Sequence, residues 1–81
     1  MRSEKVEKYD VIGRANLKSM LNSRGYMPTL KILSIKTAIT QQDIQNYIDN
    51  NGSLKIWQLQ RIANYFKVSL CWLLTNEEYK Q

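Results

Sequence analysis

Between residues 39 and 51 the sequence ITQQDIQNYIDNN concentrates side chains that donate and accept hydrogen bonds. If this segment is a helix, four polar side chains point to one side of it, namely Gln42, Gln45, Asn46 and Asp49. In the major groove of DNA, a glutamine or asparagine can make a bidentate contact with adenine that discriminates between bases by roughly 1–3 kcal/mol. A helix face that is simply solvated has the same pattern. The segment alone leaves both interpretations open.

Residues at both ends of this segment predict where the helix begins and ends. Thr40 and Asp43 have the spacing of a capping box, in which a hydroxyl and an acid satisfy free backbone amides, so the helix should begin at residue 41. The sequence NNGS at residues 50–53 closes a helix of about three turns. Its inward face is predicted to consist of Ile44, Tyr47 and Ile48.

Helical periodicity predicts two helices upstream. The first ends near Arg24, before Gly25, and its apolar face carries Leu17, Met20 and Leu21. Asp10 is a candidate N-cap for it, which leaves residues 1–9 as an arm or a helix extension. The second begins after a Thr29 cap, ends around Ala38, and lines up Leu30, Leu33, Ser34 and Thr37.

Two helices are also predicted downstream. The fourth has an apolar face of Ile56, Leu59, Ile62, Ala63 and Phe66, and Ser69 caps a short fifth helix with Leu70, Leu73 and Leu74. No segment alternates polar and apolar residues for long enough to predict a strand. We therefore expect an all-α fold with one domain over residues 10–76 and a C-terminal tail over residues 77–81.

Composition restricts the class of function. Twelve Lys and Arg against seven Asp and Glu give a net charge of +5, which favours acidic partners such as nucleic acid. With no histidine and one cysteine, the sequence has no nucleophile–base pair and no metal-ligand cluster, so we expect neither an enzyme nor a metal or other cofactor. The lack of a long apolar run and of a secretory signal predicts a cytoplasmic protein without membrane contact.

Three segments resemble the lambda-repressor/Cro-like helix-turn-helix family of DNA-binding proteins. They are NLKSMLNSRGY, LSIKTAITQQDIQNYI and LQRIANYFKVSLCWLL, which together cover most of the chain. The specific features are Ser34 at the small position of the second helix, Ala38, Ile39 and Thr40 where the family has Gly-Val-Ser, and Ile44 as the buried anchor. The resemblance implies a compact five-helix domain whose second and third helices form the helix-turn-helix, in a phage-encoded regulator.

The resemblance also implies roles for individual residues. Base-contacting or adjacent positions are Thr40, Gln41, Gln42, Gln45 and Asn46. Phosphate contacts are expected at Thr29 and Asn51, and the nearby basic side chains of Lys31, Lys36 and Lys55 would add to them, with Arg61 or with Arg2, Lys5 and Lys8 of the arm. The expected partner is a double-stranded, AT-rich operator bound by a homodimer.

Three departures from the family pattern support an alternative. First, Leu30 replaces a polar residue. Second, Asp43 and Asp49, with no Lys or Arg between Thr37 and Leu54, make the third helix acidic. Third, Ile32 and Ile35 project to the side of the second helix opposite its core face. A domain with these features can instead bind a partner repressor protein, as an antirepressor or modulator of repression in a phage genetic switch. Apolar residues at outward positions predict a dimer or partner interface that comprises Ile32, Ile35, Trp57, Cys71 and Trp72.

Overall fold

Five helices follow one another along the chain, and residues 4–77, which the structure describes, contain no strand. In this computed structural model they are α1 (Glu4–Arg24), α2 (Tyr26–Thr37), α3 (Gln41–Ile48), α4 (Ile56–Phe66) and α5 (Leu70–Thr75). Their Cα atoms have a radius of gyration of 12.1 Å, so the helices pack into one compact body. The all-helical prediction with five helices is confirmed.

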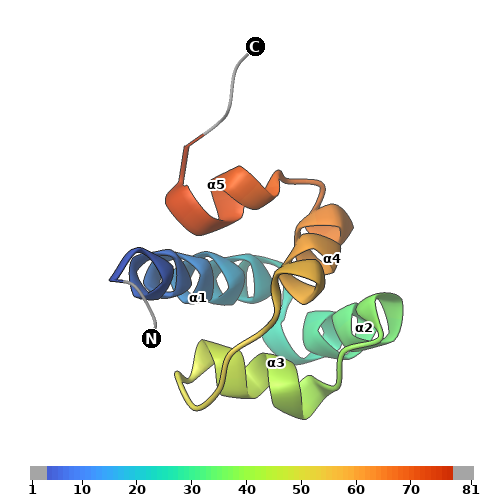
Figure 1. Cartoon of the computed structure of the whole chain (residues 1–81). Helices are drawn as coiled ribbons and strands as arrows, with labels where there is room; N and C mark the ends of the chain where they lie inside the picture. Colours follow the sequence, from blue (N-terminus) through green and yellow to red (C-terminus); the bar gives the residue numbers. More distant parts are fainter. Residues whose placement is uncertain (1–3, 78–81) are drawn as a thin grey trace.

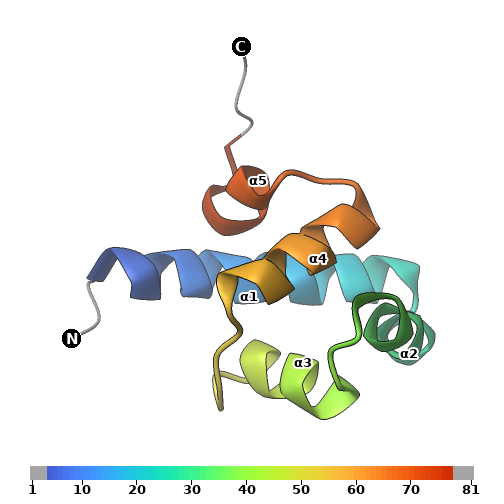
Figure 2. The ribbon, with the colours of Figure 1, turned by 45° about the vertical axis from the view of Figure 1, so that its right-hand side comes forward.

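The long helix α1 is the centre of the arrangement. In Figures 1 and 2, α5 lies on one side of α1 and α3 on the opposite side. α2 packs against α1, α3 and α4, and α5 packs against α1 and α4. α3 therefore lies at one end of the molecule, held by the two helices that precede it in the chain.

Most of the core comes from the apolar faces that the periodicity predicts, although Met20, Ile48 and Leu70 of those faces are only partly buried. Leu17 and Leu21 of α1, Leu33 of α2, and Ile44 and Tyr47 of α3 are fully buried. α4 and α5 complete the core with Leu59, Ile62, Ala63, Phe66, Leu73 and Leu74. The prediction is wrong for one residue of the α4 face, because Ile56 at the first position of that helix is exposed.

Two predicted caps are also wrong. Asp10 does not begin α1, because the helix already starts at Glu4 and Asp10 is a buried residue within it. Thr29 does not begin α2, because Gly25, with a φ of 91°, breaks the chain sharply enough for α2 to start at Tyr26. Pro28 is then in the first turn, where its missing N–H leaves no helix bond unmade.

A three-residue connection, residues 38–40, joins α2 to α3. Ala38 ends α2 in the left-handed conformation, with a φ of 61°, and the Ser34 hydroxyl donates to the Ile39 carbonyl at 2.6 Å. The Thr40 side chain then accepts a hydrogen bond from the Asp43 amide at 3.0 Å and caps α3. These local bonds fix the angle at which α3 leaves α2.

α3 is shorter than predicted. It has eight residues and ends at Ile48, after which Asn50 adopts a φ of 63°. The Asn51 amide returns to the Asn46 carbonyl at 2.7 Å, so the chain turns back instead of continuing the helix. The polar row on α3 is therefore about two turns long rather than three.

Candidate nucleic-acid interface

Tyr47 fixes α3 on the rest of the domain. Its side chain is fully buried, and its hydroxyl donates to the Asp10 carboxylate of α1 at 3.4 Å. The Arg14 side chain, also from α1, donates from Nε to the Tyr47 carbonyl at 2.9 Å and lies 5.3 Å from the centre of the Tyr47 ring. The sequence predicts Tyr47 on the inward face of this helix, and the structure buries even its hydroxyl against α1.

Gly13 provides the space that Tyr47 occupies. A Cβ atom at this position of α1 would lie 2.5 Å from the Tyr47 hydroxyl and 2.9 Å from a methyl carbon of Leu74. Both distances are shorter than a van der Waals contact, so a side chain here would displace two buried residues. Gly13 is thus needed for the close approach of α3 and α5 to α1.

Burial raises the pKa of the Tyr47 hydroxyl well above its ordinary value of about 10, and Asp10 raises it further, while Arg14 partly opposes the rise. The unfolded chain releases this proton near pH 10, whereas the folded chain retains it. The stabilisation is therefore complete below about pH 10 and is lost as the pH rises above that value.

This shift predicts a difference between wild type and Tyr47→Phe in alkaline solution. Between about pH 9 and 11, the free energy of unfolding of the wild type should fall by about 1 kcal/mol more than that of Tyr47→Phe. Urea titrations at the two pH values measure this difference, and Tyr9→Phe serves as a control that keeps Tyr47. Parallel pH profiles for wild type and Tyr47→Phe would contradict the buried hydroxyl.

Two hydrogen bonds donated by glutamine amides, one to an asparagine and one to an aspartate, organise the outward face of α3. Gln42 donates from Nε2 to Oδ1 of Asn46 at 3.0 Å, and Gln45 donates from Nε2 to Oδ1 of Asp49 at 3.1 Å. The Tyr26 hydroxyl of α2 donates to Oε1 of Gln45 at 2.9 Å. Gln45 is therefore engaged at both ends of its amide group and links α2 to α3.

Gln42 and Asn46 are the side chains that can contact a base. Gln42 is exposed and Asn46 is partly buried, and their mutual bond leaves the Gln42 carbonyl and the Asn46 amide nitrogen for a ligand. A carboxamide that donates and accepts at one edge can pair with adenine. Thr40 and Gln41 are also exposed at the start of α3.

The predicted phosphate-contacting residues do not form one group. Asn51 and Lys55 are exposed in the connection from α3 to α4, and Lys31 is exposed on α2. Lys36 is in the last turn of α2 and lines a hollow together with Arg61. Thr29 is buried and its hydroxyl donates to the Arg24 carbonyl at 3.2 Å, so it does not present a donor to a ligand. Arg2 lies outside the described residues.

The electrostatic character of α3 differs from that of its surroundings. Asp43 and Asp49 are both exposed, and α3 contains no Lys or Arg. A phosphate backbone near this helix would have to be bound by cations from other elements, such as Lys31 and Lys55. The exposed acids would oppose that contact.

The predicted interface residues fall into two sets. Ile32, Ile35 and Trp57 are exposed on α2 and α4. Trp72 is partly buried and packs against the core, and the Cys71 thiol lies 3.6 Å from the Thr75 hydroxyl. α5 is tied to α1 at this point, because Asn16 donates to the Leu73 carbonyl at 2.8 Å. The first set lies on α2 and α4 and the second on α5, so the predicted residues do not form one interface.

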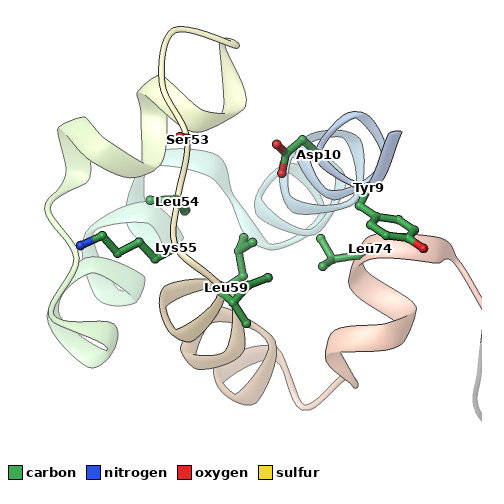
Figure 3. A pocket seen from close by; sticks show the side chains of 8 residues that line it. Tyr9, Asp10, Ser53, Leu54, Lys55, Leu59 and Leu74 are labelled. Atoms are coloured by element: carbon green, nitrogen blue, oxygen red, sulfur yellow. The ribbon is translucent and has the colours of Figure 1, made fainter. Parts of the chain in front are cut away.

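A hollow of about 390 Å³ lies between α1, the α3–α4 connection, α4 and α5. In Figure 3, Tyr9 and Asp10 approach it from α1, and Leu59 and Leu74 form part of its wall. The sequence does not predict it, because residues that are far apart along the chain surround it. Its full lining consists of Tyr9, Asp10, Ser53, Leu54, Lys55, Ile56, Leu59 and Leu74.

Within residues 4–77, no group of three or more His, Cys, Asp or Glu side chains is arranged to hold a metal ion. No helix in that same range is both long and apolar enough to cross a bilayer. Comparison of the chain with models of protein families, with curated proteins and with solved structures gave no match.

Proposed function

We propose that the protein is a sequence-specific DNA-binding transcriptional regulator that inserts α3 into the major groove. The observation that carries this proposal is the outward pair Gln42–Asn46 on a helix that Tyr47 anchors from the opposite side. A helix held rigidly at one end of a small domain can enter a groove about 12 Å wide and present its side chains to base edges. Carboxamides favour adenine, so the expected operator is AT-rich.

The order of elements supports a lambda-repressor-like arrangement with α2 and α3 as the helix-turn-helix. Their three-residue connection, the buried Ile44 and the Thr40 cap agree with the resemblance in the sequence. In this proposal Lys31, Asn51 and Lys55 contact phosphates, while the buried Thr29 does not. The regulator acts in the cytoplasm as a homodimer on a palindromic site, with α5 as the candidate dimer contact.

Selection from a pool of random duplexes tests the proposal. Immobilised protein should enrich AT-rich sequences with two related half-sites, and the affinity for an enriched duplex should fall steeply as salt increases, because phosphate contacts release counterions. Circular dichroism checks that the protein stays folded during selection. If it does, and the pool remains random after repeated rounds, the proposed function is contradicted.

The exposed Asp43 and Asp49 favour a second candidate function. Together with the carboxamides they would match a basic protein surface, such as the DNA-binding face of a repressor, better than a polyanion. In this alternative α3 is the contact of an antirepressor or modulator of repression. The same helix would then inhibit a partner instead of binding an operator.

Neutralising these acids separates the two candidates. In a DNA-binding protein, Asp43→Asn with Asp49→Asn should raise the affinity for duplex several-fold, because two charges that repel phosphates are removed. If α3 binds a basic protein, the same change should leave duplex binding absent. Fluorescence anisotropy with a labelled AT-rich duplex measures the difference, and Glu77→Gln, in an exposed residue after α5, controls for the removal of an acid outside α3.

A further inference from the structure

α2 and α4 pack against each other, and the exposed apolar and basic side chains of this helix pair define a surface that does not include the outward row of α3. We call it the α2/α4 face and define it by Ile32, Ile35, Lys36, Trp57 and Arg61. The exposed fractions of Ile35, Trp57 and Ile32 are 79%, 50% and 46%. Ile32 and Lys36 are one helical turn apart, so apolar and cationic groups are neighbours on α2.

Arg61 is held in place on this face. Its guanidinium donates to the Thr37 carbonyl at the end of α2, at 3.0 Å, and lies 4.8 Å from the centre of the Trp57 ring. A hollow of about 380 Å³ is lined by Arg61 together with Lys36, Asn64 and Tyr65. The fixed guanidinium of Arg61 can receive a carboxylate with little loss of its own side-chain freedom, and Lys36 lines the same hollow as a second cation.

The charges on these helices have one sign. Neither α2 nor α4 contains an aspartate or a glutamate. The α2/α4 face therefore presents cations that no acid of its own two helices neutralises. It is complementary to an acidic surface that also carries apolar side chains.

Two other kinds of binding partner, DNA and a second copy of the chain, fit the α2/α4 face less well than an acidic, partly apolar protein surface. A DNA backbone would satisfy Lys36 and Arg61, but it would bury Ile35 and Ile32 against charged phosphates without an apolar contact in return. A second copy of the chain, related by a two-fold axis through this face, would bring Lys36 and Arg61 close to their own equivalents. Like charges facing each other across an interface are unfavourable.

We propose that the α2/α4 face binds an acidic amphipathic helix of a partner protein. A carboxylate of that helix enters the hollow between Lys36 and Arg61, and its apolar side chains pack on Ile35 and Trp57. Tryptophan and arginine at the centre of the contact match the residue types that dominate binding energy at protein interfaces. The interaction leaves α3 free, so it is independent of whether α3 binds DNA or protein.

A displayed library of helices reveals the chemistry of the occupant directly. Each member is about 16 residues long, with leucine fixed at helix-phased positions and Glu, Lys, Gln or Ser at all others. The wild-type protein should retain helices enriched in Glu over Lys at positions beside the leucines. Retention without that enrichment, or no retention above background, would overturn the proposal.

Variants then locate the binding face. Ile35→Ser and Lys36→Gln should each weaken binding of an enriched helix about tenfold, equivalent to 1.4 kcal/mol. Val11→Ser, a change at an exposed position of α1, should leave it unchanged. All three residues are exposed, so unaltered thermal unfolding will show that folding is preserved.

Two outcomes of this series would overturn the assignment of the face. In the first, Ile35→Ser and Lys36→Gln bind the enriched helix as tightly as the wild type does. In the second, Lys36→Gln weakens duplex binding by the same factor as helix binding, which would assign the face to the DNA backbone. If Gln42→Ala loses duplex binding while helix binding is unchanged, the proposed role of the α2/α4 face still holds, because Gln42 is on α3.

Discussion

Tyr47→Ala is expected to lower the free energy of unfolding by about 3–5 kcal/mol, the range for removal of a buried aromatic side chain. A domain of this size has a total stability of about 4–12 kcal/mol, so the variant would lose much of its folded population. The reason is that Tyr47 fills the space between α3 and α1 and is hydrogen-bonded there. Urea unfolding followed by circular dichroism measures the change.

Tyr9→Ala is the control, because it removes the same side-chain type from an exposed position of α1. It should cost less than about 1 kcal/mol. Equal losses for Tyr47→Ala and Tyr9→Ala would show that Tyr47 does not anchor α3.

Gly13 provides a second test of the same contact. Gly13→Ala should destabilise the wild type by about 1–3 kcal/mol through overpacking, despite the better helix propensity of alanine. In Tyr47→Phe the hydroxyl that lies 2.5 Å from the new Cβ is absent, and the nearest remaining ring atom is 3.7 Å away. The loss of unfolding free energy caused by Gly13→Ala should then be smaller by about 0.5 kcal/mol or more. Identical costs in the two backgrounds would contradict the contact.

Gln42→Ala is expected to reduce the preference for an enriched duplex over a scrambled one by about tenfold to a hundredfold. This corresponds to the roughly 1–3 kcal/mol that a bidentate carboxamide–adenine contact contributes to discrimination. Binding to the scrambled duplex should change little, because it depends on phosphate contacts. Fluorescence anisotropy with both duplexes gives the ratio of affinities.

α4 provides a closely matched control. Gln60 donates to Asn64 at 3.0 Å, the same pair at the same spacing as Gln42 and Asn46 on α3. Gln60→Ala removes an equivalent hydrogen bond from a different helix, and it should leave the ratio unchanged. If Gln42→Ala discriminates between the duplexes as well as Gln60→Ala does, α3 does not recognise bases.

Much of the fold could be predicted because its signals are local in sequence. Thr40 and Ser69 cap α3 and α5 as expected, since each side chain bonds to an amide three residues later. The spacing of Leu59, Ile62 and Phe66 likewise locates the buried face of α4. Such patterns need only a few neighbouring residues to be interpretable.

The errors concern residues whose environment is set by distant parts of the chain. Asp10 has the side chain of an N-cap, but its partner Tyr47 is 37 positions away. Thr29 also has the side chain of a cap, yet the backbone at Gly25 decides where α2 begins. Residue type alone could not distinguish these buried positions from exposed helix ends.

The candidate site was predictable only in part, for the same reason. The periodicity places Gln42, Gln45 and Asn46 on the polar side of α3, but it cannot show that Tyr26 occupies the Gln45 amide. That contact joins residues 19 positions apart in the sequence. It gives Gln45 a structural role and leaves Gln42 and Asn46 available for a ligand. The early end of α3 was missed because the left-handed turn at Asn50 carries no glycine.

Nuclear magnetic resonance of the labelled protein titrated with an enriched duplex tests the central claim most directly. The side-chain amide signals of Gln42 and Asn46 should show the largest shifts on binding, because the Gln42 carbonyl and the Asn46 amide nitrogen, which their mutual hydrogen bond leaves available, then contact bases. The matched signals of Gln60 and Asn64 on α4 should remain in place. Unchanged Gln42 and Asn46 signals at saturating duplex would contradict base recognition by α3.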